Sequence, residues 1–122
     1  RFNSSRSENA TQYSQRLGDI SEIILPTCSD GFTHSWHQYT IRFEDRDLLR
    51  DKLSSRGIGT AVYYPRPLYH YDHLNQFSSI CPIAEKASME VLSLPVHPDL
   101  TTDDIDNISD EIIGIVNSLN AE

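Results

Sequence analysis

Lysine is scarce in this sequence. Only Lys52 and Lys86 occur among the 122 residues, and the local patterns predict that both lie in helices beside charged neighbours. A lysine that forms a Schiff base needs a desolvated pocket that lowers the pKa of its amine. Neither position is predicted to offer one, so we do not expect covalent aldimine chemistry from this chain alone.

Long apolar runs and a cysteine framework are also missing. No apolar run approaches the roughly 20 residues that cross a bilayer, so a membrane span is not expected, and no hydrophobic signal core follows Arg1. Cys28 and Cys81 lie far apart and outside any CxxC motif. We interpret them as small buried side chains of a cytoplasmic protein, with a single disulfide as the alternative.

Positive charge is in short supply. The sequence has 18 acidic against 10 basic residues, for a net charge of −8, and its bases are scattered. Such a balance repels phosphate backbones, so a nucleic-acid partner is not expected. With 38% hydrophobic and 23% charged residues, the composition is typical of one globular domain, which we place over residues 1–122.

Familiar catalytic and metal motifs are incomplete. Gly57-Ile58-Gly59 lacks the glycine or lysine that completes a nucleotide-binding loop, and Ser35 lies in no Gly-x-Ser-x-Gly elbow. His70, Asp72 and His73 have a spacing that metal sites use, but such a site also needs a third fixed ligand and supporting contacts. We interpret these three as exposed polar residues at the start of a short helix.

Apolar periodicity predicts an α/β (α+β-like) fold, with a small mixed sheet of three or four strands packed against four or five helices. The strand–helix–strand order in the middle of the chain favours a right-handed crossover. Helices are predicted over residues 4–17, 46–55, 72–77, 82–91 and beyond Thr101, and extended segments over 36–43, 58–64 and 92–95.

Helix signals and inward faces follow from the same pattern. Asp45 is a candidate N-cap, and Thr101 with Asp104 resembles a capping box. The positions predicted to face the core are Ala10, Tyr13, Leu17, His37, Tyr39, Ile41, Phe43, Leu48, Leu49, Leu53, Ile83, Ala84, Ala87, Val91, Ile105, Ile108, Ile112, Val116 and Leu119.

The best candidate for a binding site is the stretch from Tyr63 to His73. It holds tyrosines, histidines, Arg66 and Asp72, and it directly follows a predicted strand. Loops at the ends of strands commonly carry the binding groups of α/β proteins.

Five strings resemble the DegT/DnrJ/EryC1/StrS family of sugar aminotransferases. They run in order over nearly the whole chain, which makes them specific together although each would be weak alone. They are HQYTIR at 37–42, RDLL at 46–49, RGIGTAVYYP at 56–65 with Pro67-Leu68 after it, CPIAE at 81–85 and LSLPVHP at 92–98.

The resemblance is to the C-terminal small domain of the family. It implies a fold-type I enzyme that depends on pyridoxal phosphate and acts on nucleotide-linked keto sugars, with an amino donor that is commonly glutamate, in a homodimer. Cofactor and Schiff-base lysine belong to a large N-terminal domain in that family. We therefore expect no catalytic, cofactor-binding or metal-binding residue in this chain, and no activity from the chain alone.

Five substrate-binding residues follow from the resemblance: Tyr63, Tyr64, Tyr69, His37 and Arg66. Tyr63 and Tyr64 match a Tyr/His pair that lies near the sugar, and Tyr69 matches a position that is often histidine. Tyrosine hydroxyls can bond sugar oxygens while the rings pack on the sugar face. Arg66 can meet a diphosphate through charge-assisted hydrogen bonds, or else be an ordinary exposed arginine.

Two other functions stay open. A branch of the same family uses the amine form of the cofactor in sugar dehydratases, and no residue here separates the two activities. A free-standing sugar-binding or regulatory module is the third reading.

Overall fold

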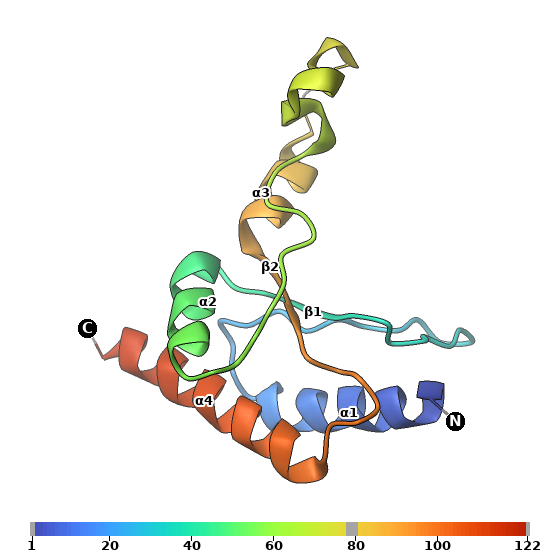
Figure 1. The fold of residues 1–122 in the computed structure, drawn as a ribbon, viewed down its shortest axis with the longest axis vertical. Coiled ribbons are helices and arrows are strands. Elements are labelled where there is room, and N and C mark those ends of the chain that lie inside the picture. Colours follow the sequence, from blue (N-terminus) through green and yellow to red (C-terminus); the bar gives the residue numbers. More distant parts are fainter. Residues whose placement is uncertain (1, 78–80, 122) are drawn as a thin grey trace.

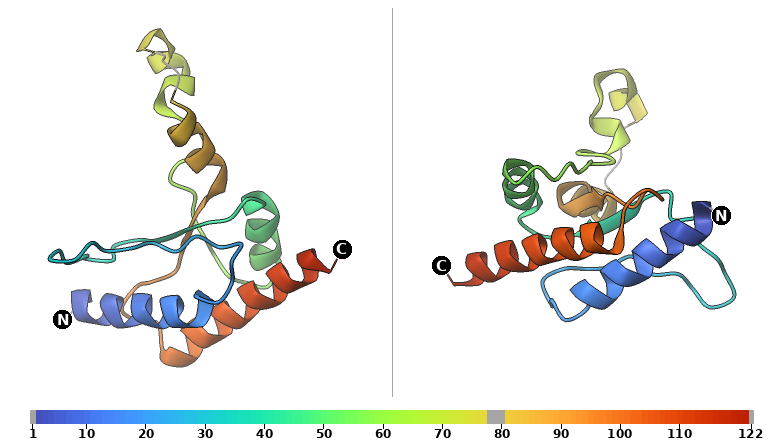
Figure 2. Two further views of the ribbon diagram at one scale, coloured as in Figure 1. Left: turned by 180° about the vertical axis from the view of Figure 1, so that it is seen from behind. Right: turned by 60° about the horizontal axis from the view of Figure 1, so that its bottom comes forward.

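The computed structural model describes residues 2–77 and 81–121. A body of helices and strands carries an arm that projects from it (Figure 1), and the views in Figure 2 show the same separation. In chain order the elements are α1 (Phe2–Leu17), β1 (Tyr39–Arg42), α2 (Arg46–Ser55), the 3-10 helices η1 (Leu68–His70) and η2 (Asp72–Phe77), α3 (Pro82–Glu90), β2 (Val91–Leu94) and α4 (Thr102–Asn120). The arm consists of η1, η2 and α3.

The sheet is smaller than predicted. Within the described residues it has two strands, β1 and β2, which pair antiparallel with Tyr39 opposite Leu94. Single antiparallel bridges add Ile24 beside Arg42 and Ala61 beside Ser93. The extended segments thus lie side by side in the order 24, β1, β2, 61, but the predicted mixed sheet of three or four strands is not confirmed.

The strand predicted over residues 58–64 is wrong. Ala61 exchanges two backbone hydrogen bonds with Ser93, of 3.1 and 2.7 Å, and the chain then bends at Tyr63. Pro65 and Pro67 lack the N–H groups that would continue a ladder. Since β1 and the segment at Ala61 each run antiparallel to β2, they run parallel to each other, as the strands of a crossover do.

The strand predicted over residues 36–43 is shorter at its start. Trp36 has φ of 54°, a left-handed conformation that interrupts an extended run. The predicted alternation holds for Tyr39, Ile41 and Phe43, which are buried. His37 is exposed, so its predicted core position is wrong, because it precedes the paired part of the strand.

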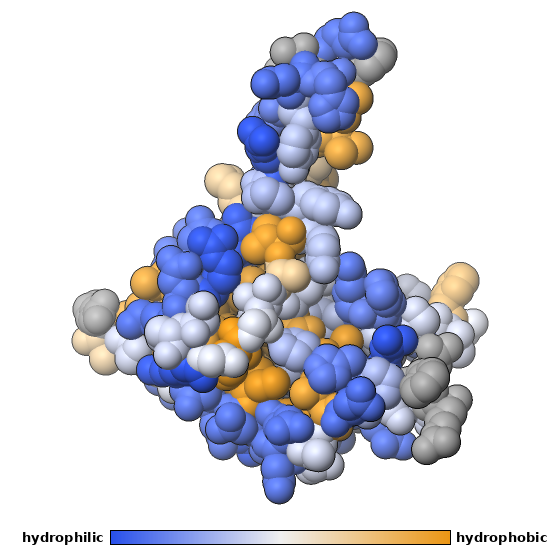
Figure 3. Space-filling model, in the orientation of Figure 1, coloured by the Kyte–Doolittle hydropathy of each residue, from blue (hydrophilic) through white to orange (hydrophobic). Residues whose placement is uncertain are grey.

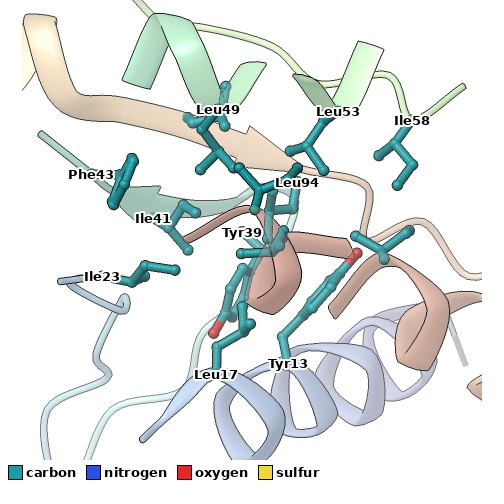
Figure 4. Close-up of a cluster of buried hydrophobic side chains, with 14 of the residues drawn as sticks. Tyr13, Leu17, Ile23, Tyr39, Ile41, Phe43, Leu49, Leu53, Ile58 and Leu94 are labelled. Atoms are coloured by element: carbon teal, nitrogen blue, oxygen red, sulfur yellow. The ribbon is translucent and has the colours of Figure 1, made fainter. Parts of the chain in front are cut away.

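The core lies between the sheet and the helices α1, α2 and α4 (Figure 4). Tyr13 and Leu17 of α1 point toward Tyr39 of β1, and Leu49 and Leu53 of α2 approach from the other side. The predicted inward positions of α1 and α4 are confirmed, apart from Leu119, which is half-buried: Ala10, Tyr13, Leu17, Ile105, Ile108, Ile112 and Val116.

Two predicted helix faces need correction. Leu48 is 42% exposed, since the buried stripe of α2 follows the i, i+4 pair Leu49 and Leu53. Ile83 is 83% exposed and Ala84 is exposed as well. These two belong to α3, which lies on the arm rather than over the sheet.

Two helices start where the sequence predicts, and they differ in whether the side chain of the N-cap residue makes a capping bond. At α4 the Asp104 amide donates to Thr101 Oγ1 at 3.1 Å, and the Thr101 amide donates to Asp104 Oδ2 at 2.8 Å, which confirms the capping box. At α2 Asp45 is the N-cap residue of a helix that spans Arg46–Ser55, as predicted, although its side chain makes no capping hydrogen bond.

A polar contact ties the arm to the body. Arg42 Nη2 of β1 pairs with Glu90 Oε1 at the end of α3, at 2.8 Å. Within the body, the buried Arg46 of α2 donates from Nη1 to the Val91 carbonyl of β2 at 2.9 Å. The arm also carries apolar side chains at its surface (Figure 3), with Leu68, Ile83 and Met89 all more than half exposed.

The cysteines are not joined by a disulfide. Cys28 is exposed and Cys81 is half-buried, which corrects the prediction of two buried side chains. Among the described residues, no helix combines the length and the apolar character that crossing a membrane requires.

Candidate substrate site

Tyr63 and Tyr64 stand where the chain leaves the sheet for the arm. Both rings are exposed, at 47% and 62%, and they meet edge to face with 5.5 Å between centroids. Exposed tyrosines of this kind need no hydrogen-bond partner from the protein, so their hydroxyls remain available to a ligand.

The two tyrosines and Arg66 line one hollow of about 280 Å³, called here the tyrosine hollow. Its opposite wall is α3, and its full lining is Tyr63, Tyr64, Arg66, Pro67, Leu68, Ala84, Ala87, Ser88 and Val91. Most of these side chains are apolar, with a few polar groups among them, as is typical of small-molecule sites. Three of the five residues predicted from the sequence are thus brought together.

Arg66 lies over the ring of Tyr71, with its Cζ atom 4.4 Å from the ring centroid. A cation over an aromatic face is stabilised by the ring quadrupole. A stacked guanidinium keeps its N–H donors in the plane of the group, so Arg66 is held in place and can still donate to an anion or a hydroxyl.

Tyr69 lies outside this hollow. Its hydroxyl donates to Glu85 Oε1 and accepts from the Cys81 amide at 3.3 Å, so it links η1 to the start of α3. Burial and, next, the hydrogen bond to Glu85 raise the pKa of the Tyr69 hydroxyl above its ordinary value. A direct contact of Tyr69 with substrate stays a prediction.

His37 lines a second and larger cavity of about 490 Å³, called here the basic groove. It is lined by Arg6, His37, Gln38, Gly59, Thr60, Ala61, Tyr63, Ser93, Leu94, Pro95, Val96 and His97. Tyr63 lines both cavities, which makes them neighbours. Arg6 and His97 were not found from the sequence, because they are brought to His37 only by the packing of α1 against the chain after β2.

The residues of this chain do not fit covalent binding of pyridoxal phosphate. Lys52 is half-buried on α2, Lys86 is exposed on α3, and neither lines the tyrosine hollow or the basic groove. Within residues 2–77 and 81–121, no three His, Cys, Asp or Glu side chains gather as metal ligands would.

Comparison with known proteins gives one family. The model of the DegT/DnrJ/EryC1/StrS aminotransferase family matches residues 1–113. The chain is 34% identical over 109 residues to a UDP-N-acetyl-3-dehydro-alpha-D-glucosamine 3-aminotransferase of Acidithiobacillus ferrooxidans, with 88% of this chain and 29% of the relative covered. It is 40% identical over 107 residues to a "pleiotropic regulatory protein" of Geobacillus stearothermophilus, with 82% and 28% covered.

Solved structures agree with this result. DesV of S. venezuelae, determined in complex with a ketimine intermediate, superposes with a TM-score of 0.84 at 30% identity, over 91% of this chain and 31% of that one. The chain therefore spans about three tenths of the length of the relatives that it matches. The match of the family model over residues 1–113 shows that the chain belongs to the DegT/DnrJ/EryC1/StrS aminotransferase family.

Proposed function

We propose that this chain is the C-terminal small domain of a pyridoxal-phosphate-dependent aminotransferase that aminates a nucleotide-linked keto sugar. The observation that carries the proposal is the tyrosine hollow, in which Tyr63, Tyr64 and Arg66 converge on one space. Family membership supports the reaction class, and the named aminotransferases among the relatives act on sugars linked to UDP or dTDP.

The tyrosine hollow would hold the sugar. Tyr63 and Tyr64 present two hydroxyls as donors or acceptors to sugar oxygens, and the edge-to-face rings give the sugar an apolar face to rest on. Holding the keto carbon in one orientation removes rotational freedom before the reaction, and such positioning can lower the activation barrier by several kcal/mol. The role of this chain is orientation.

Amine transfer would be supplied by the cofactor bound to another part of the polypeptide. The two lysines of this chain are unsuited to it, and the chain spans about 29% of a typical relative. We infer that the cofactor pocket lies in the remaining part, that the chain by itself is inactive, and that the whole enzyme is a cytoplasmic homodimer that uses glutamate as amino donor.

A regulatory sugar-binding module is the second candidate. The relative with 40% identity bears the name of a regulatory protein, and the tyrosine hollow needs no catalytic group to bind a sugar. A module of this kind would keep sugar binding without turnover.

The test uses the complete polypeptide that contains these residues. The protein is loaded with pyridoxal phosphate and incubated with L-glutamate and a panel of nucleotide-linked keto sugars, and 2-oxoglutarate and the sugar product are measured by mass spectrometry. We expect 2-oxoglutarate together with an amino sugar. Loss of water from the sugar without amine gain would indicate the dehydratase, and saturable sugar binding without any product would indicate the module.

A further inference from the structure

The basic groove brings basic side chains together on a chain that is otherwise acidic. Arg6 of α1, His37 before β1 and His97 after β2 all line it, although the chain carries a net charge of −8. Among the described residues, none that lines the groove is an aspartate or a glutamate. A cationic side chain such as that of Arg6, in a cavity whose lining has no acidic residue, raises the local concentration of anions.

Arg6 is the group with unmet hydrogen-bonding capacity. Its Nε atom is shielded from solvent, yet it has no hydrogen-bond partner among the described residues. A buried donor that lacks a partner is unfavourable by the cost of removing it from water, and rotation of the guanidinium toward an anion in the groove would relieve that cost.

The fold holds Arg6 at this place. Asn9, one turn further along α1 and buried, donates from its amide nitrogen to the carbonyls of Val96 and His97, at 3.4 and 3.1 Å. These bonds fix α1 against the segment that contains His97. Residues three apart on a helix share a face, so the anchor at Asn9 also positions Arg6 beside the groove.

One carboxylate that adjoins the groove is already hydrogen-bonded. Asp104 lines an adjoining hollow together with His97, but its carboxylate accepts the amide of Thr101 in the capping box. His97 therefore lines both the basic groove and the hollow that contains Asp104.

We propose that the basic groove is an oxyanion subsite formed by Arg6, His37 and His97. Because Tyr63 lines both cavities, an anion in the groove lies next to a sugar in the tyrosine hollow. The inference rests on the proposed function for the source of the anion. Two sources have the same chemistry: the diphosphate of the nucleotide-linked sugar, and a carboxylate of the amino donor.

The test titrates this chain with two simple probes, inorganic diphosphate and glutarate, and follows the histidine ring signals by NMR. Saturable shifts of His37 and His97 with diphosphate alone would assign the groove to the nucleotide sugar. The same shifts with glutarate alone would assign it to the amino donor. If neither probe shifts these signals up to tens of millimolar, the proposal is overturned.

Variants separate a site from general charge attraction. Arg6→Gln is expected to weaken binding of the effective probe by about tenfold, since a charge-assisted hydrogen bond is lost. Arg50→Gln removes the same charge from α2, away from the groove, and is expected to leave binding unchanged. Far-ultraviolet circular dichroism checks that both variants fold. If the Arg6→Gln variant does not fold, His97→Gln provides a second test.

Equal weakening in the Arg6→Gln and Arg50→Gln variants would overturn the proposal, as would no weakening in Arg6→Gln. The outcome is independent of the proposed function, because inorganic diphosphate and glutarate need neither sugar nor turnover. Binding without any aminotransferase activity in the complete polypeptide would leave the subsite in place and remove the proposed reaction.

Discussion

Tyr13 and Tyr39 stack in the centre of the core, with 5.0 Å between ring centroids and 29° between ring planes. Their hydroxyls form hydrogen bonds with different residues. Tyr13 donates to the Pro95 carbonyl at 2.6 Å, and the Tyr39 hydroxyl shares a hydrogen bond of 2.9 Å with Ser14. Burial raises the pKa of both hydroxyls above the ordinary value for tyrosine. The pair joins α1 to β1 and to the chain after β2.

Tyr13→Phe tests this junction. The ring stays, but the Pro95 carbonyl loses its donor, so we expect the free energy of unfolding to fall by about 1–2 kcal/mol. Urea unfolding followed by circular dichroism measures the change. Tyr64→Phe is the matched control, because its ring is 62% exposed and its loss of a hydroxyl should leave stability unchanged. Equal stabilities for Tyr13→Phe and the wild type would contradict the role of this bond.

Leu53→Ala tests the packing of α2. Leu53 is fully buried, so its truncation should leave a cavity and lower the free energy of unfolding by about 2–5 kcal/mol. Leu48→Ala removes the same atoms from a side chain that is 42% exposed, and should cost less than about 1 kcal/mol. Thermal or urea unfolding of both variants measures the two losses of stability. A larger loss for Leu48→Ala would mean that α2 presents its other face to the core.

Asp104 gives a dependence of stability on pH. The hydrogen bond from the Thr101 amide, the largest cause, lowers the pKa of Asp104 below its ordinary 3.8. A carboxyl whose pKa is lower in the folded state stabilises the fold above its unfolded pKa, and this contribution is lost as the pH falls through the folded pKa. The stability difference between wild type and Asp104→Asn should therefore be full at pH 7 and shrink below about pH 4.

Urea midpoints at pH 7, 4, 3 and 2 measure that difference. Asp103→Asn serves as the control, since it lies in the same first turn of α4 and shares any effect of the helix dipole. Its difference from the wild type should vary less with pH than that of Asp104→Asn. Identical pH profiles for the two variants would argue against the capping carboxylate as the cause.

Tyr64→Phe tests the tyrosine hollow in the complete enzyme. Loss of one hydroxyl that orients the sugar should lower kcat/KM about tenfold or more, while the melting temperature stays the same. Steady-state kinetics with the accepted nucleotide-linked sugar gives the first value and calorimetry the second. Tyr71→Phe is the control, because Tyr71 does not line the hollow. Unchanged kinetics in Tyr64→Phe, and in Tyr63→Phe as well, would remove both residues from the site.

Borohydride trapping tests the expectation about the lysines. The chain is mixed with pyridoxal phosphate and reduced, and the adducts are located by mass spectrometry. We expect no stoichiometric adduct, because Lys86 is exposed and Lys52 only half-buried, so neither amine is desolvated enough to react selectively. A specific adduct on either lysine would show that this chain holds the cofactor itself.

The helices could be predicted from the sequence because their signals are local. The capping box at Thr101 and the isoleucines that follow it at helical spacing define α4. Pro82 lies in the first turn of α3, where the fixed φ angle of proline favours the start of a helix. The sheet was harder to predict. A strand over residues 58–64 would have to pair along its length with β2, and β2 is only four residues long. The sequence of residues 58–64 carries no information about the length of that partner.

For the site as well, the residues that are close in sequence could be predicted and the distant ones could not. Tyr63, Tyr64 and Arg66 are close in sequence, so one stretch was enough to find the tyrosine hollow. Arg6 and His97 reach the basic groove from opposite ends of the chain, and no spacing in the sequence could indicate that meeting. The exposure of Ile83 also escaped prediction, because helical periodicity says which side chains share a face but not whether anything covers it.

The projecting arm has a consequence for how the molecule opens. Of the body elements, β1 is the one on which α3 makes its main contact, and Leu68, Ile83 and Met89 add little burial there. Segments with few apolar contacts open at a lower free energy than the global unfolding transition. Backbone amides of η1, η2 and α3 should thus exchange their hydrogens well before those of α4, so that Tyr64 lies on the boundary between a quickly exchanging and a slowly exchanging region.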